Sequence, residues 1–272
     1  MDPDQVNVLV LTGYGTNCER ETAYAARTAG ADSVSVAHFS DLVQERLFVS
    51  DYQLIVFPGG FLDGDHLGAA QAAAVRFTYA RTASGACLLD SIKKGLSRGC
   101  LLLGICNGFQ LLVKLGLLPA LNETRGERHL SLSFNDSARF EDRWTRLIVN
   151  PDAPCVFTRG LERMYLPVRH GEGKLIPRDG TTLSELRQRD LIVLQYADSS
   201  WKATQAYPDN PNGSPLAIAG LTDPSGQILG LMPHPEAFNH PTNHPDWPRN
   251  GLDPLGTELF VNAIEHLRGR RQ

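Results

Sequence analysis

The chain has 272 residues, of which 42% are hydrophobic and 21% charged, with a formal net charge of −4 at pH 7. This balance excludes the strongly basic surface typical of nucleic-acid-binding proteins, and no apolar run approaches the roughly 20 residues that a membrane span needs. The stretch "MDPDQVNVLVLTG" starts acidic, unlike a secretory signal, so we expect a cytoplasmic protein with neither nucleic acid nor membrane as a partner.

The first half of the chain alternates apolar strands with helices. The patterns predict strands over 6–15, 33–39, 52–60 and 99–106, and helices over 18–31, 40–48, 68–81 and 107–116, with Ser40 as the N-cap of the second helix. Apolar strands that alternate with helices indicate an α/β fold, in which helices cover both faces of a parallel sheet.

The second half contains more strands and fewer helices. Strands are predicted over 139–150, 163–175, 190–198, 215–223 and 228–236, and a closing helix over 254–268. There is no internal repeat, long linker or low-complexity segment, so we expect one domain over 1–272.

One of the five cysteines lies between a strand and a helix. Gly104-Ile105-Cys106-Asn107-Gly108 has the form G-x-C-x-G, the thiol counterpart of the nucleophile elbow G-x-S-x-G. A thiol at a helix N-terminus has a lowered pKa, which favours a nucleophile at Cys106; the alternative is a buried cysteine packed between glycines. The odd number of cysteines and the absence of C-x-x-C argue against a disulfide framework or a zinc knuckle for the others.

The segment "LMPHPEAF" supplies a candidate base for the cysteine. On an extended chain, residues two apart face the same way, so Glu236 is expected to orient His234, leaving the second imidazole nitrogen free to accept a proton from a thiol. A Pro-rich surface turn is one alternative. A metal site on His234, Glu236, His240 and His244 is the other, but the prolines at 235, 241 and 245 forbid the helix that would align such ligands, so we expect no metal.

Two glycine-rich segments complete the set of candidate motifs. "FPGGF" at 57–61 ends the third predicted strand, and a backbone N–H there, together with that of Asn107, could form an oxyanion hole. "HGEGK" at 170–174 lacks the third glycine of a dinucleotide fingerprint, and no phosphate-binding G-x-x-x-x-G-K-[ST] occurs, so ATP is not expected to bind this chain.

Together, the elbow cysteine, the PGG turn and the late H-P-E resemble the class I (triad) glutamine amidotransferases. Within that class, several segments spread over almost the whole chain resemble the glutaminase subunits of phosphoribosylformylglycinamidine synthase. These segments are "GTNCERETAYAARTAGA", "GGFLDGDHLGAA", "GICNGFQLL", "RHGEGKL", "NPNGSPLAIAGL" and "GLMPHPEAF". The resemblance implies a three-layer, flavodoxin-like domain with a mainly parallel central sheet and an added antiparallel β region.

The resemblance also implies roles for individual residues. Cys106 would attack the side-chain amide of L-glutamine, His234 would act as the base and Glu236 would orient it. The backbone at Gly60 and Asn107 would hold the oxyanion. The rest of the glutamine pocket is expected from Gly59, Gln110, His170, Gly171, Glu172 and Gly173.

The same resemblance implies partners. The family's synthetase is a separate large subunit that holds ATP and Mg, often with a small third subunit, so this chain is expected to need no cofactor of its own. Two departures from the family pattern are Leu62-Asp63, where Ser-Tyr is usual, and the long stretch 239–254, which we expect to form a surface loop near the subunit interface. Two alternatives stay open: a glutaminase serving a different synthetase, and a non-catalytic regulatory subunit.

Overall fold

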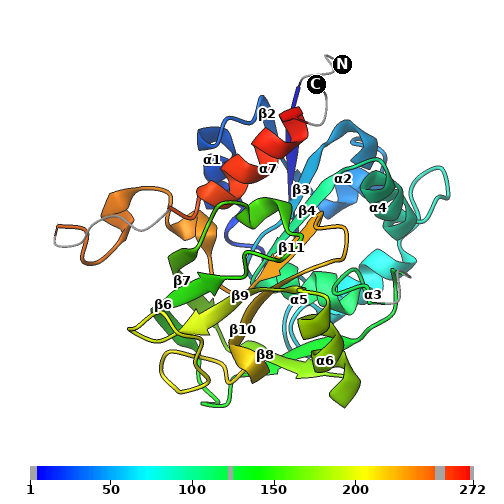
Figure 1. Cartoon of the computed structure of the whole chain (residues 1–272). Helices are drawn as coiled ribbons and strands as arrows, with labels where there is room; N and C mark the ends of the chain where they lie inside the picture. Colours follow the sequence, from blue (N-terminus) through cyan, green and yellow to red (C-terminus); the bar gives the residue numbers. More distant parts are fainter. Residues whose placement is uncertain (1–4, 122–124, 249–254, 270–272) are drawn as a thin grey trace.

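A nine-stranded sheet organises the chain (Figure 1). The computed structural model describes residues 5–121, 125–248 and 255–269. In spatial order the strands are β2 (Ser33–His38), β1 (Asn7–Thr12), β3 (Leu54–Phe57), β4 (Leu101–Ile105), β11 (Ile228–Leu231), β10 (Ile218–Thr222), β9 (Ile192–Ala197), β6 (Glu141–Val149) and β7 (Arg163–His170).

The sheet has a parallel half and an antiparallel half. The pairs β2–β1, β1–β3, β3–β4 and β4–β11 are parallel, whereas β11–β10, β10–β9, β9–β6 and β6–β7 are antiparallel. The predicted α/β fold, with a parallel sheet and an added antiparallel region, is therefore confirmed. Since β1, β3, β4 and β11 run in the same direction, the turns that follow them meet at one edge of the sheet, where ligands bind in open α/β folds.

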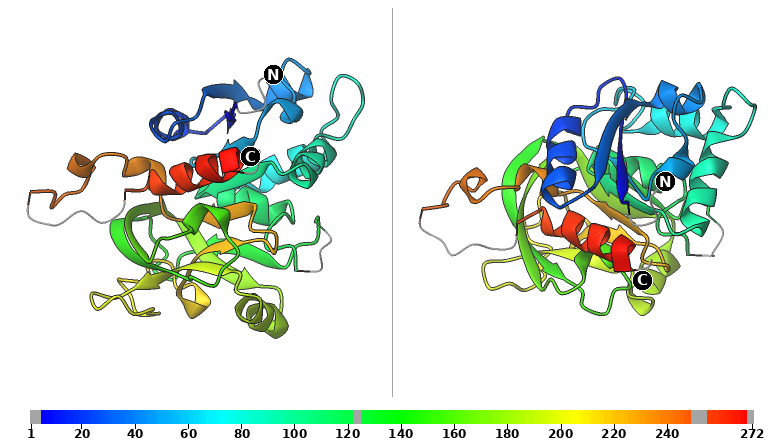
Figure 2. Two further views of the ribbon diagram at one scale, coloured as in Figure 1. Left: turned by 45° about the horizontal axis from the view of Figure 1, so that its top comes forward. Right: turned by 90° about the horizontal axis from the view of Figure 1, so that it is seen from above.

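Helices cover both faces of the parallel half (Figures 1 and 2). On one face α1 (Glu19–Thr28) packs beside α7 (Glu258–Gly269). On the other lie α3 (Gln71–Tyr79), α4 (Leu88–Ser97) and α5 (Asn107–Lys114), with α2 (Phe39–Val43) against α3 through the rings of Phe39 and Phe77. Among the described residues, no helix is both long and apolar enough to cross a membrane.

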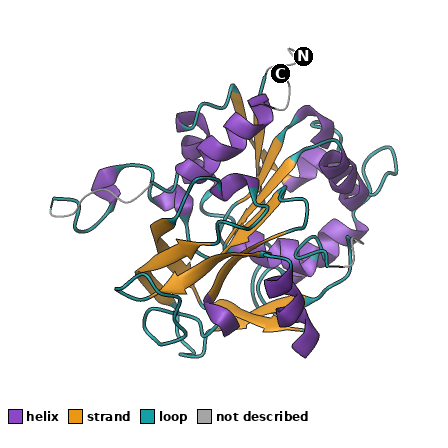
Figure 3. Cartoon of the chain, in the orientation of Figure 1, coloured by secondary structure: helices purple, strands orange, loops and turns teal. Residues whose placement is uncertain are grey.

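A second, two-stranded sheet lies beside α5 (Figure 3). It pairs β5 (Leu130–Phe134) with β8 (Glu172–Pro177), and α6 (Gly180–Gln188) follows β8. The prediction of one strand over 163–175 was wrong, because the chain turns at Gly171 and β7 and β8 enter different sheets. This turn brings the "HGEGK" segment next to the helix that follows the elbow cysteine.

The start of α2 also differs from the prediction. Ser40 is not the N-cap: the N-cap is His38, whose Nδ1 accepts a hydrogen bond from the Ser40 N–H, while Asp41 accepts from the His38 N–H at 3.0 Å. The helix ends at Val43 rather than near residue 48, and Glu45 beyond it has a φ of +55°. Helices α4 and α6 and strand β5 are present in addition to the predicted elements.

Candidate active site

Cys106 sits at the turn from β4 into α5, as the elbow motif predicts. Its φ of 50° and ψ of −103° lie outside the regions that non-glycine residues favour, and its N–H donates to the carbonyl of Leu231 at 2.8 Å. Backbone strain of this kind persists where the surrounding structure enforces it, and it clusters at active sites. The geometry presents the Cys106 side chain at the carboxyl edge of the sheet.

The two glycines of the motif are required by close packing. A Cβ at Gly108 would lie 1.9 Å from the carbonyl oxygen of Phe57, and one at Gly104 would lie 2.5 Å from Leu112 Cδ1. Real Cβ atoms do not approach backbone so closely, so α5 could not pack against β3 with a larger residue at 108. The tight elbow is thus specified by the sequence around the cysteine.

His234 follows β11 and is oriented by Glu236. Its Nδ1 lies 2.6 Å from Glu236 Oε1, both side chains are buried, and the His234 N–H donates to the carbonyl of Pro167 at 2.8 Å. The segment is not extended as predicted, because 235–237 form a 3-10 turn, yet the carboxylate still reaches the ring. Burial alone would lower the pKa of His234, but the Glu236 carboxylate and the Cys106 sulfur raise this pKa well above its ordinary value.

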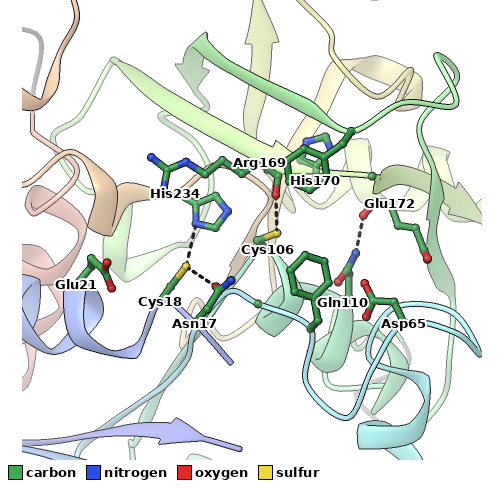
Figure 4. Close-up of a pocket in the computed structure, with 14 residues that line it drawn as sticks. Asn17, Cys18, Glu21, Asp65, Cys106, Gln110, Arg169, His170, Glu172 and His234 are labelled. Atoms are coloured by element: carbon green, nitrogen blue, oxygen red, sulfur yellow. Dashed lines mark hydrogen bonds between the residues drawn. The ribbon is translucent and has the colours of Figure 1, made fainter. Parts of the chain in front are cut away.

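Cys106 and His234 line the same pocket, which has a volume of about 240 Å³ (Figure 4). The Cys106 Sγ is directed at the carbonyl of Arg169, 3.6 Å away. Within the described residues, Nε2 of His234 has no hydrogen-bond partner. A nucleophilic thiol and an imidazole with a free nitrogen, held through its other nitrogen by a carboxylate, form the arrangement required for covalent catalysis.

The two residues whose backbone N–H groups are expected to form an oxyanion hole, Gly60 and Asn107, lie at the same edge. Gly60 lines the pocket with a φ of +136°, and a Cβ there would lie 2.7 Å from the carbonyl oxygen of Gly15. Asn107 is the first residue of α5, so its N–H has no acceptor within the helix. Gly59 has a different position: a Cβ there would lie 2.7 Å from His234 Cε1, so this glycine makes room for the imidazole and does not line the pocket.

The departure at Leu62-Asp63 has a structural role. The Leu62 N–H donates to Asn107 Oδ1 at 3.0 Å, and Asp63 forms an ion pair with Arg76 at 3.0 Å. The Asn107 amide also donates to Gln110 Oε1 at 3.0 Å. The Leu62 bond therefore ties the loop after the PGG turn to the first turn of α5, and the Asp63 ion pair ties the same loop to α3.

The opposite wall of the pocket is polar and acidic. Gln110 donates to the carbonyl of Glu172 at 2.5 Å, and the Glu172 side chain accepts from the Ala69 N–H at 3.1 Å. Asp65 lines the same wall, and in the described part of the chain its Oδ1 is buried without a hydrogen-bond partner. Burial and the neighbouring Glu172 raise the pKa of Asp65, whereas burial lowers the pKa of nearby Lys114. This wall is suited to a cationic group.

His170 is part of the pocket lining but is held as a neutral group. Its Nδ1 lies 3.1 Å from Asn135 Oδ1, which also accepts the Gly173 N–H at 3.0 Å. Burial, reinforced by the charge of His234, lowers the pKa of His170 to about 3. Gly171 lines the pocket; Gly173 lies behind it, where a Cβ would be 2.6 Å from His170 Cε1.

The structure brings most of the predicted residues to one pocket and adds several that the sequence analysis did not single out. Asn107 and Glu236 support the site without lining it, as do Gly59 and Gly173. The added lining residues are Asn17, Cys18, Glu21, Phe61, Asp65, Phe140 and Arg169. All of these except Phe140 lie in segments that carry the family resemblance, namely "GTNCERE", "GGFLDGDHLGAA" and "RHGEGKL", which are the sequence signal for them.

His240 and His244, the other two histidines of the alternative metal site, make contacts outside the pocket. His240 Nδ1 lies 2.8 Å from Thr242 Oγ1, and the His244 ring packs at 4.7 Å from that of Trp144. Neither lines the pocket. Part of the stretch 239–254 lies outside the described residues, and its predicted position at an interface stays a prediction.

Comparisons with known proteins agree with this geometry. A family model for the CobB/CobQ-like glutamine amidotransferase domain matches residues 5–267. The phosphoribosylformylglycinamidine synthase subunit PurQ of Dehalococcoides mccartyi is 41% identical over 97% of this chain and 98% of its own length. The corresponding protein of Archaeoglobus fulgidus is 39% identical over 87% of this chain and 89% of its own.

Two solved structures have a fold similar to that of this chain. The structure of PurLQS from Thermotoga maritima contains a chain that is 29% identical, with a TM-score of 0.69, covering 97% of this chain and 99% of that one. A putative GMP synthase component from Thermoplasma acidophilum is 15% identical with a TM-score of 0.54, covering 98% and 96%. The second likeness extends only to the fold.

Proposed function

The chain belongs to the CobB/CobQ-like glutamine amidotransferase domain family, and from that premise we propose that it is the glutaminase subunit of phosphoribosylformylglycinamidine synthase. The observation that carries the proposal is the strained Cys106 in one pocket with the free Nε2 of a histidine that Glu236 orients. The PurQ relatives match over nearly the full length of this chain, which supports the assignment of the client reaction.

The proposed reaction begins with glutamine in the pocket. Cys106 Sγ attacks the side-chain amide carbonyl carbon, while its proton goes to Nε2 of His234 and the carbonyl oxygen becomes an oxyanion. In this proposal the N–H groups of Gly60 and Asn107 donate to that oxyanion. The raised pKa of His234 favours the imidazolium that this step creates, and the Glu236 carboxylate stabilises it.

The tetrahedral intermediate then collapses. The C–N bond breaks, His234 returns its proton to the departing nitrogen, and ammonia leaves a glutamyl thioester on Cys106. A water molecule, deprotonated by His234, attacks the thioester carbonyl and releases glutamate and the Cys106 thiol. The net reaction is glutamine plus water to glutamate plus ammonia.

We assign the acidic wall to the α-ammonium group of glutamine. Asp65 has a buried oxygen without a partner among the described residues, and burial together with the adjacent Glu172 raises its pKa. A bound ammonium would pair with this oxygen and relieve the repulsion between the two carboxylates. His170, held neutral, adds no positive charge that would oppose this binding.

The ammonia is proposed to pass to a separate synthetase subunit. The Thermotoga structure is that of PurLQS, which supports a complex with a large synthetase and with a small third subunit. In this proposal the synthetase holds ATP and Mg and acts on formylglycinamide ribonucleotide. This chain then supplies only the nitrogen.

Reconstitution with the synthetase tests the proposal. The chain is combined with the large subunit, formylglycinamide ribonucleotide and Mg-ATP, and product formation from glutamine is compared with that from ammonium. We expect Cys106→Ala to abolish the glutamine-dependent reaction and to leave the ammonium-dependent one intact. The control is Cys87→Ala, a half-buried cysteine outside the pocket, which should support both reactions.

Other outcomes would contradict the proposal. If wild type forms product from ammonium but not from glutamine, even when the third subunit is present, the chain serves a different synthetase. If Cys106→Ala still uses glutamine, the nucleophile is wrong.

A further inference from the structure

A second cysteine reaches the catalytic histidine. Cys18, which immediately precedes α1, is half-buried in the pocket lining, and its Sγ lies 4.0 Å from His234 Nδ1 (Figure 4). The proposed mechanism uses Cys106 and leaves this thiol without a role. Its Sγ also lies 3.2 Å from Asn17 Oδ1, and a Cβ at Gly59 would be 3.3 Å from it, so the sulfur has a defined position.

Cys18, His234 and Glu236 together form a set of metal-binding groups. One ligand atom from each, a thiol sulfur, an imidazole nitrogen and a carboxylate oxygen, lies within 4.8 Å of the other two. In a tetrahedral zinc site these atoms would be separated by about 3.4 to 3.6 Å, given the usual zinc–ligand bond lengths. The sulfur would move toward Nδ1 by less than an ångström, and the Glu236 oxygen would move away from its 2.6 Å contact with Nδ1.

The Glu236 carboxylate has one oxygen that is available to bind a metal ion. Glu236 is 1% exposed, and in the described ranges its Oε2 is buried without a hydrogen-bond partner. Cys18 and His234 both face the pocket, which would admit an ion and provide a water molecule as the fourth ligand. Three such protein ligands with one open position are the pattern of an accessible zinc site rather than a closed structural one.

We propose that Cys18, His234 and Glu236 form an inhibitory site for zinc or another thiolate-preferring divalent metal ion. Binding displaces the proton from the Cys18 thiol and places the metal on His234 Nδ1. This site differs from the metal site considered from the sequence, because it uses Cys18 in place of His240 and His244.

The inhibitory effect follows from the tautomer of His234, and this part of the inference rests on the proposed function. Catalysis needs the proton on Nδ1, donated to Glu236, so that the lone pair of Nε2 faces the pocket. With a metal on Nδ1, the neutral ring carries its proton on Nε2 and can no longer accept one from Cys106. The same ion takes the Glu236 carboxylate away from its orienting contact.

A binding experiment without turnover tests the site itself. Cadmium is titrated into the Cys106→Ala variant while the ultraviolet charge-transfer absorption between thiolate and cadmium is recorded. We expect saturation at one ion per chain, and loss of this signal when Cys18→Ser is added to Cys106→Ala. Adding Cys87→Ala instead is the matched control and should leave the signal unchanged.

An inhibition experiment tests the consequence. Zinc is titrated against glutamine hydrolysis by the complex, and each variant is referred to its own metal-free rate. Loss of a direct ligand should raise the half-inhibiting zinc concentration at least roughly tenfold in both Cys18→Ser and Cys18→Ala, and a chelator should restore wild-type activity. Thermal unfolding of each variant establishes that it is folded.

The outcomes separate this inference from the proposed function. A cadmium signal that survives Cys18→Ser, or that requires Cys106, would overturn the site, as would equal zinc sensitivity of wild type and both Cys18 variants. A metal-free wild type without glutaminase activity would contradict the proposed function, while the cadmium titration would still decide whether the metal site exists.

Discussion

The two ends of the pocket are built in different ways. At the catalytic end, Cys106 and His234 are fixed by backbone, because each follows a buried parallel strand and its N–H donates to a carbonyl of another strand. At the acidic end, Asp65 and Glu172 are half-buried carboxylates from loops and a strand start, with fewer direct contacts. In the proposed function, reactivity therefore depends on the backbone geometry of two turns, whereas glutamine recognition depends on the charge of two half-buried carboxylates.

The largest expected effect is at the elbow glycine. Gly108→Ala places a Cβ where the Phe57 carbonyl oxygen lies 1.9 Å away, so α5 must separate from β3. We expect a loss on the order of 4 kcal/mol in the free energy of unfolding, measured by denaturant titration. The control is Gly180→Ala at the start of α6, where no atom lies within 4 Å, and which should change stability little. Equal stability of the two variants would contradict the backbone account.

The next effect concerns the orientation of the base. Glu236→Gln replaces an acceptor by an amide that can donate to His234 Nδ1, which moves the ring proton to Nε2 and blocks proton transfer from Cys106. We expect kcat for glutamine hydrolysis to fall on the order of 10² to 10⁴-fold, with ammonium-dependent synthesis unchanged. A fall of less than about threefold would show that Glu236 does not set the tautomer.

Substitutions at the acidic end should change the KM for glutamine rather than kcat. Asp65→Asn and Glu172→Gln each remove a charge near the proposed α-ammonium position, and a charge-assisted hydrogen bond is worth about 1.5 to 3 kcal/mol. We expect KM for glutamine to rise roughly 10- to 100-fold while kcat changes little. The measurement is steady-state glutamine hydrolysis by the complex, and an unchanged KM with a reduced kcat would reverse the assignment of the two ends.

The smallest effect is a pH dependence of stability. His170 has a pKa lowered by burial to about 3 from an ordinary 6.5, so the folded state binds fewer protons than the unfolded state between these values. The stability associated with neutral His170 is present above pH 6.5 and is lost progressively as the pH falls toward 3. Between pH 7 and pH 5 the wild type should lose about 2 kcal/mol more than His170→Asn, measured by urea unfolding. Parallel losses in the two proteins would contradict a neutral, buried His170.

The two ends of the pocket also differ in how far their residues can be predicted from the sequence. Cys106, His234 and Glu236 lie in short motifs whose turn chemistry is local, so the strand patterns and the glycine spacing suffice to place them at one edge of the sheet. Asp65, by contrast, reaches the pocket only because the loop after β3 folds back toward β8, a contact over more than a hundred residues. No local pattern predicts such a contact.

One wrong prediction, the strand over 163–175, and one residue that the sequence did not single out, Cys18, have the same kind of physical reason. The turn at Gly171 moves β8 out of the main sheet, although 163–175 reads as one continuous strand. Cys18 resembles an ordinary small residue before a helix, and its position 4.0 Å from His234 follows from the packing of the β1–α1 loop against the PGG turn. Both features depend on tertiary contacts, which secondary-structure propensities and hydrophobic periodicity do not encode.

Covalent labelling with a glutamine-mimicking diazo ketone tests whether the two ends form one glutamine site with Cys106 as its nucleophile, since the reagent must bind at the acidic end and react at the catalytic end. The adduct is located by mass spectrometry of the complex, using wild type, Cys106→Ala and Cys18→Ser. We expect one adduct on Cys106 in wild type and in Cys18→Ser, protection by glutamine, and no adduct in Cys106→Ala. An adduct on Cys18, or unchanged labelling of Cys106→Ala, would contradict this expectation.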